Sequence, residues 1–405
     1  MKNNQTPEIR FPGFIEYWKQ QKLGDLADFS KGNGYSKSDL TDEGEPIILY
    51  GRLYTKYETV IESVDTFTIE KEKSVVSKGN EVIVPSSGET SEDISRASVV
   101  KEPGIILGGD LNIIRPTNDI DSVFLALSIS NGKQRKELIK RAQGKSVVHL
   151  HNSDLKEVNL SFSKKEEQTK IADFFKQLDA TIVFQEQELT TLKQTKQGFL
   201  QKMFPKEGES VPEVRFLEFT GDWEQHALKD LGEIKTGSTP STADVDNYSE
   251  DGMIWVTPTD IDNRVTTVTA KKLSEKGQLK ARIVKPGTIL VTSIASIGKN
   301  TMVKEYASFN QQINSLTPSE ENDSYFLLTQ SDFWSRKMKN TAASGTMQII
   351  NKNDFSNISV LVPKIEEQTK IGNFFKQLDD TIALHQRELD ALKETKKAFL
   401  QKMFV

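Results

Sequence analysis

Cysteine is absent from the 405 residues of this chain, and histidine occurs four times. Without cysteine the chain has no disulfide, no catalytic thiolate and no cysteine-ligated metal site, as is common in a reducing cytoplasm. His149 and His151 form the one close histidine pair in the sequence. Alternation along a strand would place both on one face, but two histidines are a weak metal signal. We therefore expect no metal site.

Long apolar runs are missing as well. No stretch approaches the ~18 apolar residues of a membrane span, and the start, MKNNQTPEIRF, lacks the apolar segment of a signal peptide. We expect a cytoplasmic protein, long enough for two or three domains with their own cores. The net charge of −5, taken over the whole chain, argues mildly against nucleic acid as a partner. It leaves room for a local basic face.

The common catalytic motifs are also absent. Gly298 and Lys299 end the segment SIASIGKN, which looks like a phosphate-binding loop. However, Ser293 stands where that motif needs glycine, and Asn300 stands where it needs serine or threonine. The chain has no Gly-x-Gly-x-x-Gly, no His-Glu-x-x-His and no Asn-Pro-Pro-Tyr motif of amino-methyltransferases. We predict that it catalyses no reaction by itself.

What the chain does contain is a long internal repeat. Residues 164–204, KKEEQTKIADFFKQLDATIVFQEQELTTLKQTKQGFLQKMF, return almost unchanged at 364–404. The segments that open each half repeat too, as PEIRF from Pro7 and PEVRF from Pro212. A repeat with this long a period indicates a duplicated domain instead of a solenoid. Constant segments around divergent middles predict two versions of one recognition module.

Each copy of the repeat is predicted to be one long helix. Ser163 and Glu166 form a capping-box pattern that places the first start near Lys164, and Pro205 ends that copy. Apolar residues alternate at spacings of four and three, which is the heptad pattern of a coiled coil. The seam residues are Ile171, Phe175, Leu178, Ile182, Leu189, Leu192 and Phe199 in the first copy, and Ile371, Phe375, Leu378, Ile382, Leu389, Leu392 and Phe399 in the second.

Two helices with the same seam in one chain are predicted to pair with each other. The alternative is that each helix packs on its own globular domain. A pseudo-two-fold axis between the copies favours an antiparallel pair. The order of segments is then nearly cyclic, so the C-terminus is expected near the first domain. Polar Gln185, His385, Lys196 and Lys396 within the seam are candidates to fix its register.

The divergent middles read as α+β domains. β-branched runs such as EPIILYG, EVIVPSS and GTILVTS end in proline, glycine and serine turns, and helices are expected at 123–141 and 324–339. The predicted fold class is α+β: two pseudo-two-fold-related α/β domains with twisted sheets, separated by a long antiparallel two-helix coiled coil. The predicted divisions are a first domain at 1–162, a helix at 163–204, a linker at 205–211, a second domain at 212–362 and a helix at 363–405.

Loops at the strand ends are the candidate binding elements, because binding residues collect on loops held by rigid scaffolds. They mix hydroxyl, amide and basic side chains, which suit base edges and phosphates, although surface loops are polar in any protein. The candidates in the first domain are Lys31, Asn33, Tyr35, Lys37, Arg52, Tyr54, Ser86, Ser87, Arg96, Lys145, Ser146 and His149. In the second domain they are Lys235, Ser238, Thr239, Ser241, Thr257, Thr259, Ser293, Lys299, Asn300, Gln311, Gln348 and Lys352.

Two basic segments occupy matching places before a glycine turn. They are RKELIKR, from Arg135, and SRKMKN, from Ser335. Each is either a contact to the phosphate backbone or a solvated helix face, and the sequence does not separate these two readings.

These repeats resemble the specificity subunit of type I restriction–modification enzymes. The resemblance rests on EEQTKI-x-x-FFKQLD and FLQKMF in both helices, on PE-[IV]-RF opening each half, and on GSTPST from Gly237. It covers essentially the whole chain. The divergent middles look like the family's two target-recognition domains. The first of them departs most, because GNGYSKS replaces GSTPST there.

The resemblance implies a non-catalytic DNA reader of a split, asymmetric target, with the helices setting the spacer between its halves. It also implies partners: double-stranded DNA, two modification subunits that methylate adenine, and restriction subunits that act as motor and nuclease. S-adenosylmethionine, ATP and magnesium would be bound by those partners, and no cofactor by this chain. The chief alternative is a coiled-coil scaffold that holds two protein-interaction domains and binds no DNA. A reader serving a fused enzyme of type IIG kind is a further, weaker alternative.

Overall fold

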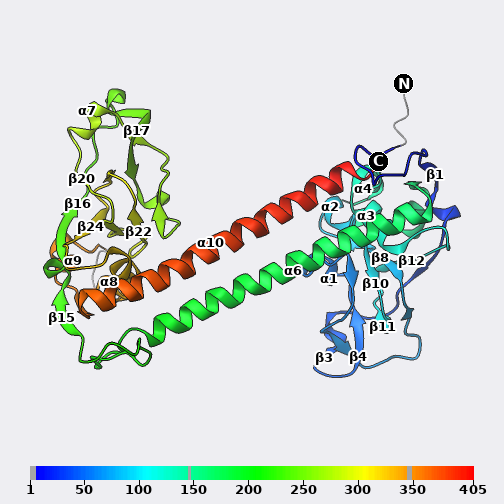
Figure 1. The fold of residues 1–405 in the computed structure, drawn as a ribbon. Coiled ribbons are helices and arrows are strands. Elements are labelled where there is room, and N and C mark those ends of the chain that lie inside the picture. Colours follow the sequence, from blue (N-terminus) through cyan, green and yellow to red (C-terminus); the bar gives the residue numbers. More distant parts are fainter. Residues whose placement is uncertain (1–5, 145–146, 344–348) are drawn as a thin grey trace. The chain divides into compact units, whose positions relative to one another are not determined.

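The computed structural model describes residues 6–144, 147–343 and 349–405. It divides into two compact units. The first unit comprises residues 1–186 and 388–405, and the second comprises residues 187–387. Two long helices, α6 (Lys165–Lys202) and α10 (Ile365–Lys402), each give one half to each unit. Figure 1 shows both helices as continuous.

The first unit contains two five-stranded sheets. One has the order β2 (Ala27–Lys31), β12 (Leu111–Pro116), β8 (Glu81–Pro85), β10 (Ser98–Val100) and β5 (Val60–Ile61). The other has the order β3 (Leu40–Thr41), β6 (Phe67–Thr68), β4 (Glu45–Ile48), β11 (Pro103–Leu107) and β7 (Val76–Lys78). Two small pairs complete it: β1 (Lys19–Lys22) with β14 (Asn159–Phe162), and β9 (Ser87–Gly88) with β13 (Val148–His149).

The second unit repeats this arrangement. Its five-stranded sheet has the order β16 (Gly232–Thr236), β24 (Ile313–Pro318), β21 (Ile289–Thr292), β22 (Asn300–Val303) and β18 (Val265–Thr266). A four-stranded sheet follows, with β19 (Lys272–Leu273), β17 (Tyr248–Val256), β23 (Ala307–Phe309) and β20 (Ile283–Val284). The remaining pair is β15 (Glu224–Ala227) with β25 (Ser359–Val362).

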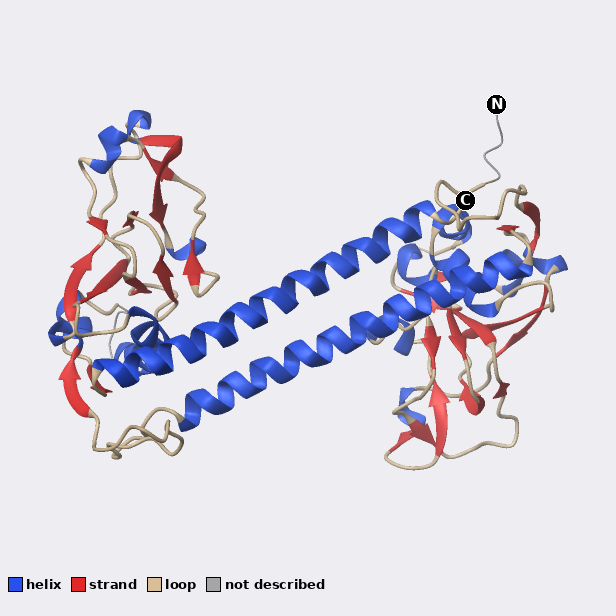
Figure 2. Ribbon diagram, in the orientation of Figure 1, coloured by secondary structure: helices blue, strands red, loops and turns tan. Residues whose placement is uncertain are grey.

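Helices pack on the first sheet of each unit (Figure 2). In the first unit α3 (Ser122–Ser130) packs on the sheet, and α4 (Gly132–Arg141) packs against α3. In the second unit one longer helix, α8 (Ser324–Ala343), stands in their place. The short helices are α1 (Arg52–Thr55), α2 (Ser91–Ile94), α5 (Asn152–Lys156), α7 (Glu275–Gln278) and α9 (Lys352–Ser356).

Within each unit the two long helices run antiparallel. In the first unit Phe174 packs edge-on against Phe399 at 5.1 Å between ring centroids, and Lys396 forms an ion pair with Asp179. In the second unit the same contacts recur, with Phe199 against Phe374 at 5.0 Å. There Lys196 Nζ lies 2.5 Å from Asp379 Oδ1. The predicted antiparallel pairing is therefore confirmed within each unit, and both seam lysines bridge the helices.

The chain end packs where the sequence predicts it, in the first unit. The Ile9 amide donates to the Lys402 carbonyl oxygen at 3.0 Å. In the second unit, the Val214 amide donates to the Lys202 carbonyl oxygen at 2.9 Å. Phe404 and Phe204 likewise pack against equivalent aromatic residues, Phe124 and Phe326. Each PE-[IV]-RF segment is therefore held by the C-terminal end of a long helix.

The helix start expected near Lys164 is confirmed, because α6 begins at Lys165. The Ser163 hydroxyl donates to the Lys164 carbonyl oxygen there, in place of the expected capping box. The helix expected over 123–141 needs correction, because it is two helices. They meet at Asn131 and Gly132, where Gly132 has a left-handed φ of +64°. The strands expected at EPIILYG, EVIVPSS and GTILVTS are confirmed as β4, β8 and β21.

One difference between the two helix copies predicts a change in stability. Gly198 in α6 occupies the position that Ala398 occupies in α10, and a Cβ built on Gly198 meets no heavy atom within 4 Å. We expect Gly198→Ala to raise the free energy of unfolding by about 1 kcal/mol, because glycine is the poorer helix former by that amount. Ala398→Gly is the matched reverse change and should lower it by a similar amount. Chemical denaturation measures both, and a loss of stability in Gly198→Ala would contradict the open surroundings of this position.

Candidate nucleic-acid interface

In the second unit, loops from distant parts of the sequence are joined through backbone hydrogen bonds at one edge of the sheets. The Ser238 amide donates to the Phe309 carbonyl oxygen at 2.9 Å, and the Asn310 amide donates to the Val256 carbonyl oxygen at 2.8 Å. The Ser293 amide donates to the Gln312 carbonyl oxygen at 2.8 Å. We call residues 237–241, 257–260, 293 and 310–312 the second loop cluster.

Side chains on the second loop cluster bond to one another. Thr239 Oγ1 donates to Gln311 Oε1, and Asn310 Nδ2 donates to Thr239 Oγ1 at 3.2 Å. The Thr257 and Thr259 hydroxyls lie 2.9 Å apart, and Thr257 also bonds to Asp260. Thr239, Thr259 and Gln311 are exposed. The cluster therefore offers solvent a set of neutral donors and acceptors, as base edges require.

A close backbone approach builds this cluster. A Cβ on Gly237 would lie against the carbonyl oxygens of Phe309 and Asn310, closer than real Cβ atoms come to their neighbours. Gly32 has the same relation to the Gly108 carbonyl oxygen in the first unit. Glycine at both positions lets the loop after β16, or after β2, pass directly over the neighbouring turn.

The first unit has an equivalent cluster with different side chains. The Asn33 amide donates to the Leu107 carbonyl oxygen at 3.1 Å, and the Ser86 amide donates to the Asp110 carbonyl oxygen at 2.8 Å. The Tyr54 hydroxyl donates to the Ser87 carbonyl oxygen at 2.6 Å. We call residues 32–35, 49–54, 86–90, 107–110 and 149 the first loop cluster. Exposed Asn33 and His149 give it a chemistry unlike that of the second loop cluster.

Of the predicted site residues, ten are exposed: Lys31, Asn33, Lys37, His149, Thr239, Ser241, Thr259, Lys299, Gln311 and Lys352. Five are partly buried: Ser87, Arg96, Lys235, Ser238 and Thr257. Their role in binding stays a prediction. Lys145, Ser146 and Gln348 lie outside the described residues.

The other six predicted site residues, Tyr35, Arg52, Tyr54, Ser86, Ser293 and Asn300, are engaged inside the fold. Tyr35 is buried against Ile47 and Ile106. The Arg52 side chain is 8% exposed and paired with Glu58 and Asp65.

Tyr54 and Ser293 are among these six. Burial raises the pKa of Tyr54, so its hydroxyl stays protonated and donates to the Ser87 carbonyl oxygen. Ser293 Oγ accepts a hydrogen bond at 2.8 Å from the buried Asn314. These side chains hold the loops in place.

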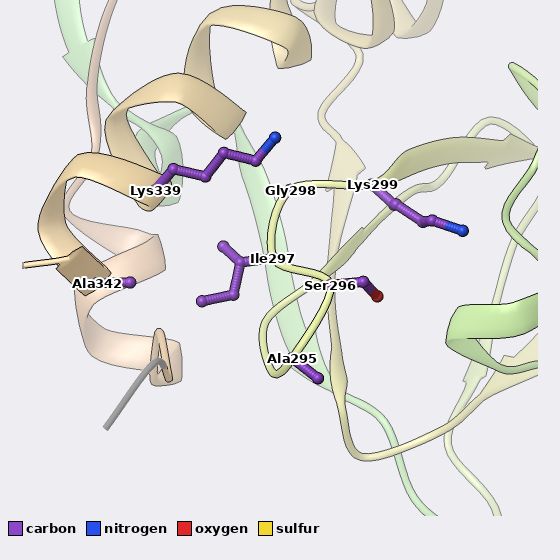
Figure 3. Close-up of a pocket in the computed structure, with 7 residues that line it drawn as sticks. All are labelled: Ala295, Ser296, Ile297, Gly298, Lys299, Lys339 and Ala342. Carbon is purple, nitrogen blue, oxygen red and sulfur yellow. The ribbon is translucent and has the colours of Figure 1, made fainter. Parts of the chain in front are cut away.

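Lys299 lies beside a cavity of about 470 Å³ between the 295–299 loop and α8. Figure 3 shows its side chain directed away from Lys339 on α8. Its Nζ lies 3.3 Å from Asp262 Oδ1. Asn300, the next residue, faces inward and accepts from Arg264 at 2.7 Å. The structure therefore separates two residues that the sequence analysis grouped together.

Sequence reasoning missed Arg282 and Trp255. The Arg282 amide donates to Ser238 Oγ at 2.8 Å, and its guanidinium donates to the Thr236 carbonyl oxygen. Trp255 Nε1 donates to the Ser238 carbonyl oxygen at 3.1 Å. Arg282 is 44 residues from Ser238 along the chain. Only the tertiary contact reveals that it adds a cation to the second loop cluster.

Metal ligation and membrane insertion find no support in the part of the chain that the structure describes. Residues 6–144, 147–343 and 349–405 contain no group of three or more histidine, aspartate or glutamate side chains placed to hold a metal ion. Among the helices of these ranges, none is long and apolar enough to cross a membrane. His149 and His151 stack with 6.3 Å between their ring centroids, and both are exposed.

Comparison with known protein families gives two matches, one in each half. Residues 15–194 and 220–394 each match the family described as "Type I restriction modification DNA specificity domain". The two matches together cover most of the chain. Each begins near the opening segment of its half and ends within the long helix that follows.

Three relatives show the same likeness. The putative type I restriction enzyme MjaX specificity subunit of Methanocaldococcus jannaschii is 22% identical over 95% of this chain and 92% of its own length. The HindI specificity subunit of Haemophilus influenzae is 31% identical over 48% of this chain and 47% of its own. The MjaIX specificity subunit, also from M. jannaschii, is 27% identical over 45% of this chain. That alignment spans 44% of the relative, less than half its length.

Solved structures show a shared fold. The crystal structure of a type I restriction-modification S subunit from M. genitalium superposes with a TM-score of 0.66, at 16% identity, over 99% of both chains. A structure described as showing complex assembly and conformational transition of a type I R-M system gives a TM-score of 0.54 at 16% identity. It covers 97% of this chain and 98% of that one.

Proposed function

We propose that this chain, which belongs to the type I restriction–modification DNA specificity family, reads a two-part DNA target. One loop cluster would read each half. The observation that carries the proposal is the presence of two clusters on one scaffold. Gly32 and Gly237 build the same backbone approach, while the side chains around them differ. A shared scaffold with different hydrogen-bonding groups suits the reading of two different base sequences.

The domain divisions follow from this proposal. Residues 1–162 and 212–362 are the two target-recognition domains, joined by a helix at 163–204 and a linker at 205–211, and followed by a helix at 363–405. The helices would fix the spacer between the two halves of the target. The chain itself is not an enzyme: it directs the chemistry of its partner subunits to a sequence.

The long helices are the proposed docking site for two modification subunits. Two helices alone leave much of their apolar surface in solvent: Phe184 is 57% exposed, Val183 is 50% exposed and Leu384 is 48% exposed. Exposed apolar residues at equivalent places in both copies support packing of further helices there. The modification subunits would bring S-adenosylmethionine, and restriction subunits would bring ATP and magnesium, so that this chain needs no cofactor.

The test uses the full-length chain, with and without modification subunits, and a pool of random-sequence duplexes. We expect mobility-shift selection to enrich a bipartite sequence. A chain in which residues 1–160 are replaced by the first domain of a relative should enrich a target changed in one half and preserved in the other, because each cluster lies in its own unit. Sequencing of the enriched pools measures both halves.

Two results would contradict the proposal. If neither condition gives sequence-preferring binding, the chain is no DNA reader, and the scaffold alternative gains support. If the exchanged chain changes both halves of the target, the assignment of one loop cluster to each half is wrong.

A further inference from the structure

A cavity of about 250 Å³ lies in the first unit, between residues 57–59, Arg96, α3, α4 and α10. Three cationic side chains from three different elements line it. Arg96 follows α2, Arg135 belongs to α4 and Lys396 belongs to α10. Hydrogen-bonding side chains also line it, namely those of Tyr57, Thr59, Ser130 and Asn131, and Leu127 and Leu400 complete the lining.

The charges around this cavity do not balance. Arg96 Nη2 lies 3.2 Å from Asp93 Oδ1, and Lys396 forms an ion pair with Asp179. Arg135 has no such partner: among the described residues no carboxylate lies within ion-pair distance of it, and its Nε is buried without a hydrogen bond. Within the described ranges its guanidinium makes one hydrogen bond, a long one of 3.4 Å from Nη2 to the Glu92 carbonyl oxygen. Three cations face two carboxylates, so the cavity carries a net positive charge.

The equivalent place in the second unit has a different side chain. Val60 of β5 pairs with Val99, and Val265 of β18 pairs with Met302 in the equivalent ladder. The preceding residues, Thr59 and Arg264, therefore occupy corresponding positions.

Arg264 is neutralised by carboxylates of its own unit. Its guanidinium donates to Asp332 at 2.8 Å and to Asn300 at 2.7 Å, and its Nε lies 3.8 Å from Asp379. In the first unit the shorter Thr59 leaves this space open. Arg135 and Arg96 then supply the positive charge from the cavity walls.

We propose that this cavity binds a phosphate group of the DNA backbone next to the first loop cluster, an inference that rests on the proposed function. Arg96 follows α2, which contacts β9 and β13 of the first loop cluster, and Tyr57 follows the 49–54 loop. A duplex lying on this cluster would bring its backbone toward the cavity. Guanidinium groups bind phosphate oxygens through charge-assisted hydrogen bonds, often two at once. Phosphate contacts position a protein on the duplex and carry no sequence information. Arg135 is therefore a positioning residue, and the bases are read elsewhere.

The test is Arg135→Gln in the full-length chain. Binding is measured with or without modification subunits, in whichever condition the wild-type chain binds DNA. The probes are a duplex with the enriched target and a mixed-sequence duplex. We expect weaker binding to both by the same factor. We also expect the slope of log affinity against log salt to become shallower by about 0.9, the change for one lost phosphate contact. The enriched sequence should stay the same. Arg96→Gln is a second variant with the same expected direction.

Lys136→Gln is the matched control, because Lys136 is the next residue of α4, is exposed and does not line the cavity. If Arg135→Gln and Lys136→Gln give the same slope as the wild-type chain, the cavity holds no DNA phosphate and the proposal fails while the proposed function stands. Calorimetry measures the binding of inorganic phosphate. If Arg135→Gln loses this binding but keeps the wild-type slope of log DNA affinity against log salt, the cavity is a site for free anions, and the proposal is also overturned. Absence of wild-type DNA binding refutes the proposed function itself.

Discussion

Replacing Glu167 by alanine is expected to lower the stability of the first unit by about 3–5 kcal/mol, the usual cost of removing one partner of a buried ion pair. The Glu167 side chain is 1% exposed and receives both hydrogen bonds of a forked contact from Arg10, at 2.8 and 2.7 Å. This hydrogen bonding raises the pKa of Arg10. Without Glu167 the guanidinium still stays charged, because arginine is protonated in proteins at any ordinary pH. The contact ties the opening segment of the chain to the start of α6.

The duplication supplies a matched variant, Glu367→Ala. Arg215 makes the same forked contact to Glu367, at 2.8 and 2.7 Å. Trp18 Nε1 also donates to Glu167 at 3.2 Å, whereas Trp223 Nε1 is buried without a hydrogen bond. Glu167→Ala therefore leaves one more buried donor, Trp18 Nε1, without a hydrogen bond. It should lower the free energy of unfolding by about 1–3 kcal/mol more than Glu367→Ala does.

Denaturation followed by hydrogen exchange measures these costs in each unit separately, because two units need not unfold together. Wild-type stability in both variants would contradict the buried pairs. Equal costs would show that the contact of Trp18 with Glu167 contributes nothing.

Replacing Gly237 by alanine is expected to abolish recognition of one half of the target. The added Cβ would collide with the backbone carbonyl oxygens of Phe309 and Asn310, which no side-chain rotation relieves. The 237–241 loop and the 310–312 turn must then separate, which displaces Thr239 and Gln311 together. Each lost base contact costs about 1–3 kcal/mol of binding free energy, so several together should exceed a hundredfold in affinity. Competition mobility shifts with half-site-substituted duplexes measure the effect.

Gly51→Ala is the control for this variant. A Cβ on Gly51 meets no heavy atom within 4 Å, and its φ of −59° suits alanine. Gly51 belongs to the first loop cluster, so we expect Gly51→Ala to leave discrimination at the half read by the second loop cluster unchanged. If Gly237→Ala retains discrimination at both halves, the second loop cluster does not read DNA.

The long helices and most strands could be predicted from the sequence, because heptad spacing and β-branched runs are local signals. The division of each helix between two units could not, since it depends on which half of α6 meets which half of α10. Near-identity of the two copies also hides a local difference. Ala172 fits its surroundings, whereas a Cβ on the corresponding Gly372 would collide with Asp323 and lie 2.9 Å from the Phe326 amide. The repeat is thus not freely interchangeable.

For the site, the sequence indicates which loops lie at the strand ends and misjudges which side chains face solvent. Tyr35 and Arg52 have polar tips typical of contact residues, yet tertiary partners in the first unit engage both. Arg282 is separated from Ser238 by 44 residues that include three strands, so no spacing rule finds it. The cationic cavity is a further case. Its open space depends on Thr59 standing where the other half has Arg264, and only the strand register makes that comparison.

The first unit is built from two separate segments of the chain, and this has a consequence for its synthesis on the ribosome. The second unit is one continuous segment, residues 187–387, and has all its parts once that segment has emerged. The first unit needs residues 388–405, which carry Phe399, Lys402 and Phe404 to their partners. The domain that is translated first is therefore the last to be completed. Until the second unit has been made, the first unit of a nascent chain lacks the contacts of Phe124 with Phe404 and of Phe174 with Phe399.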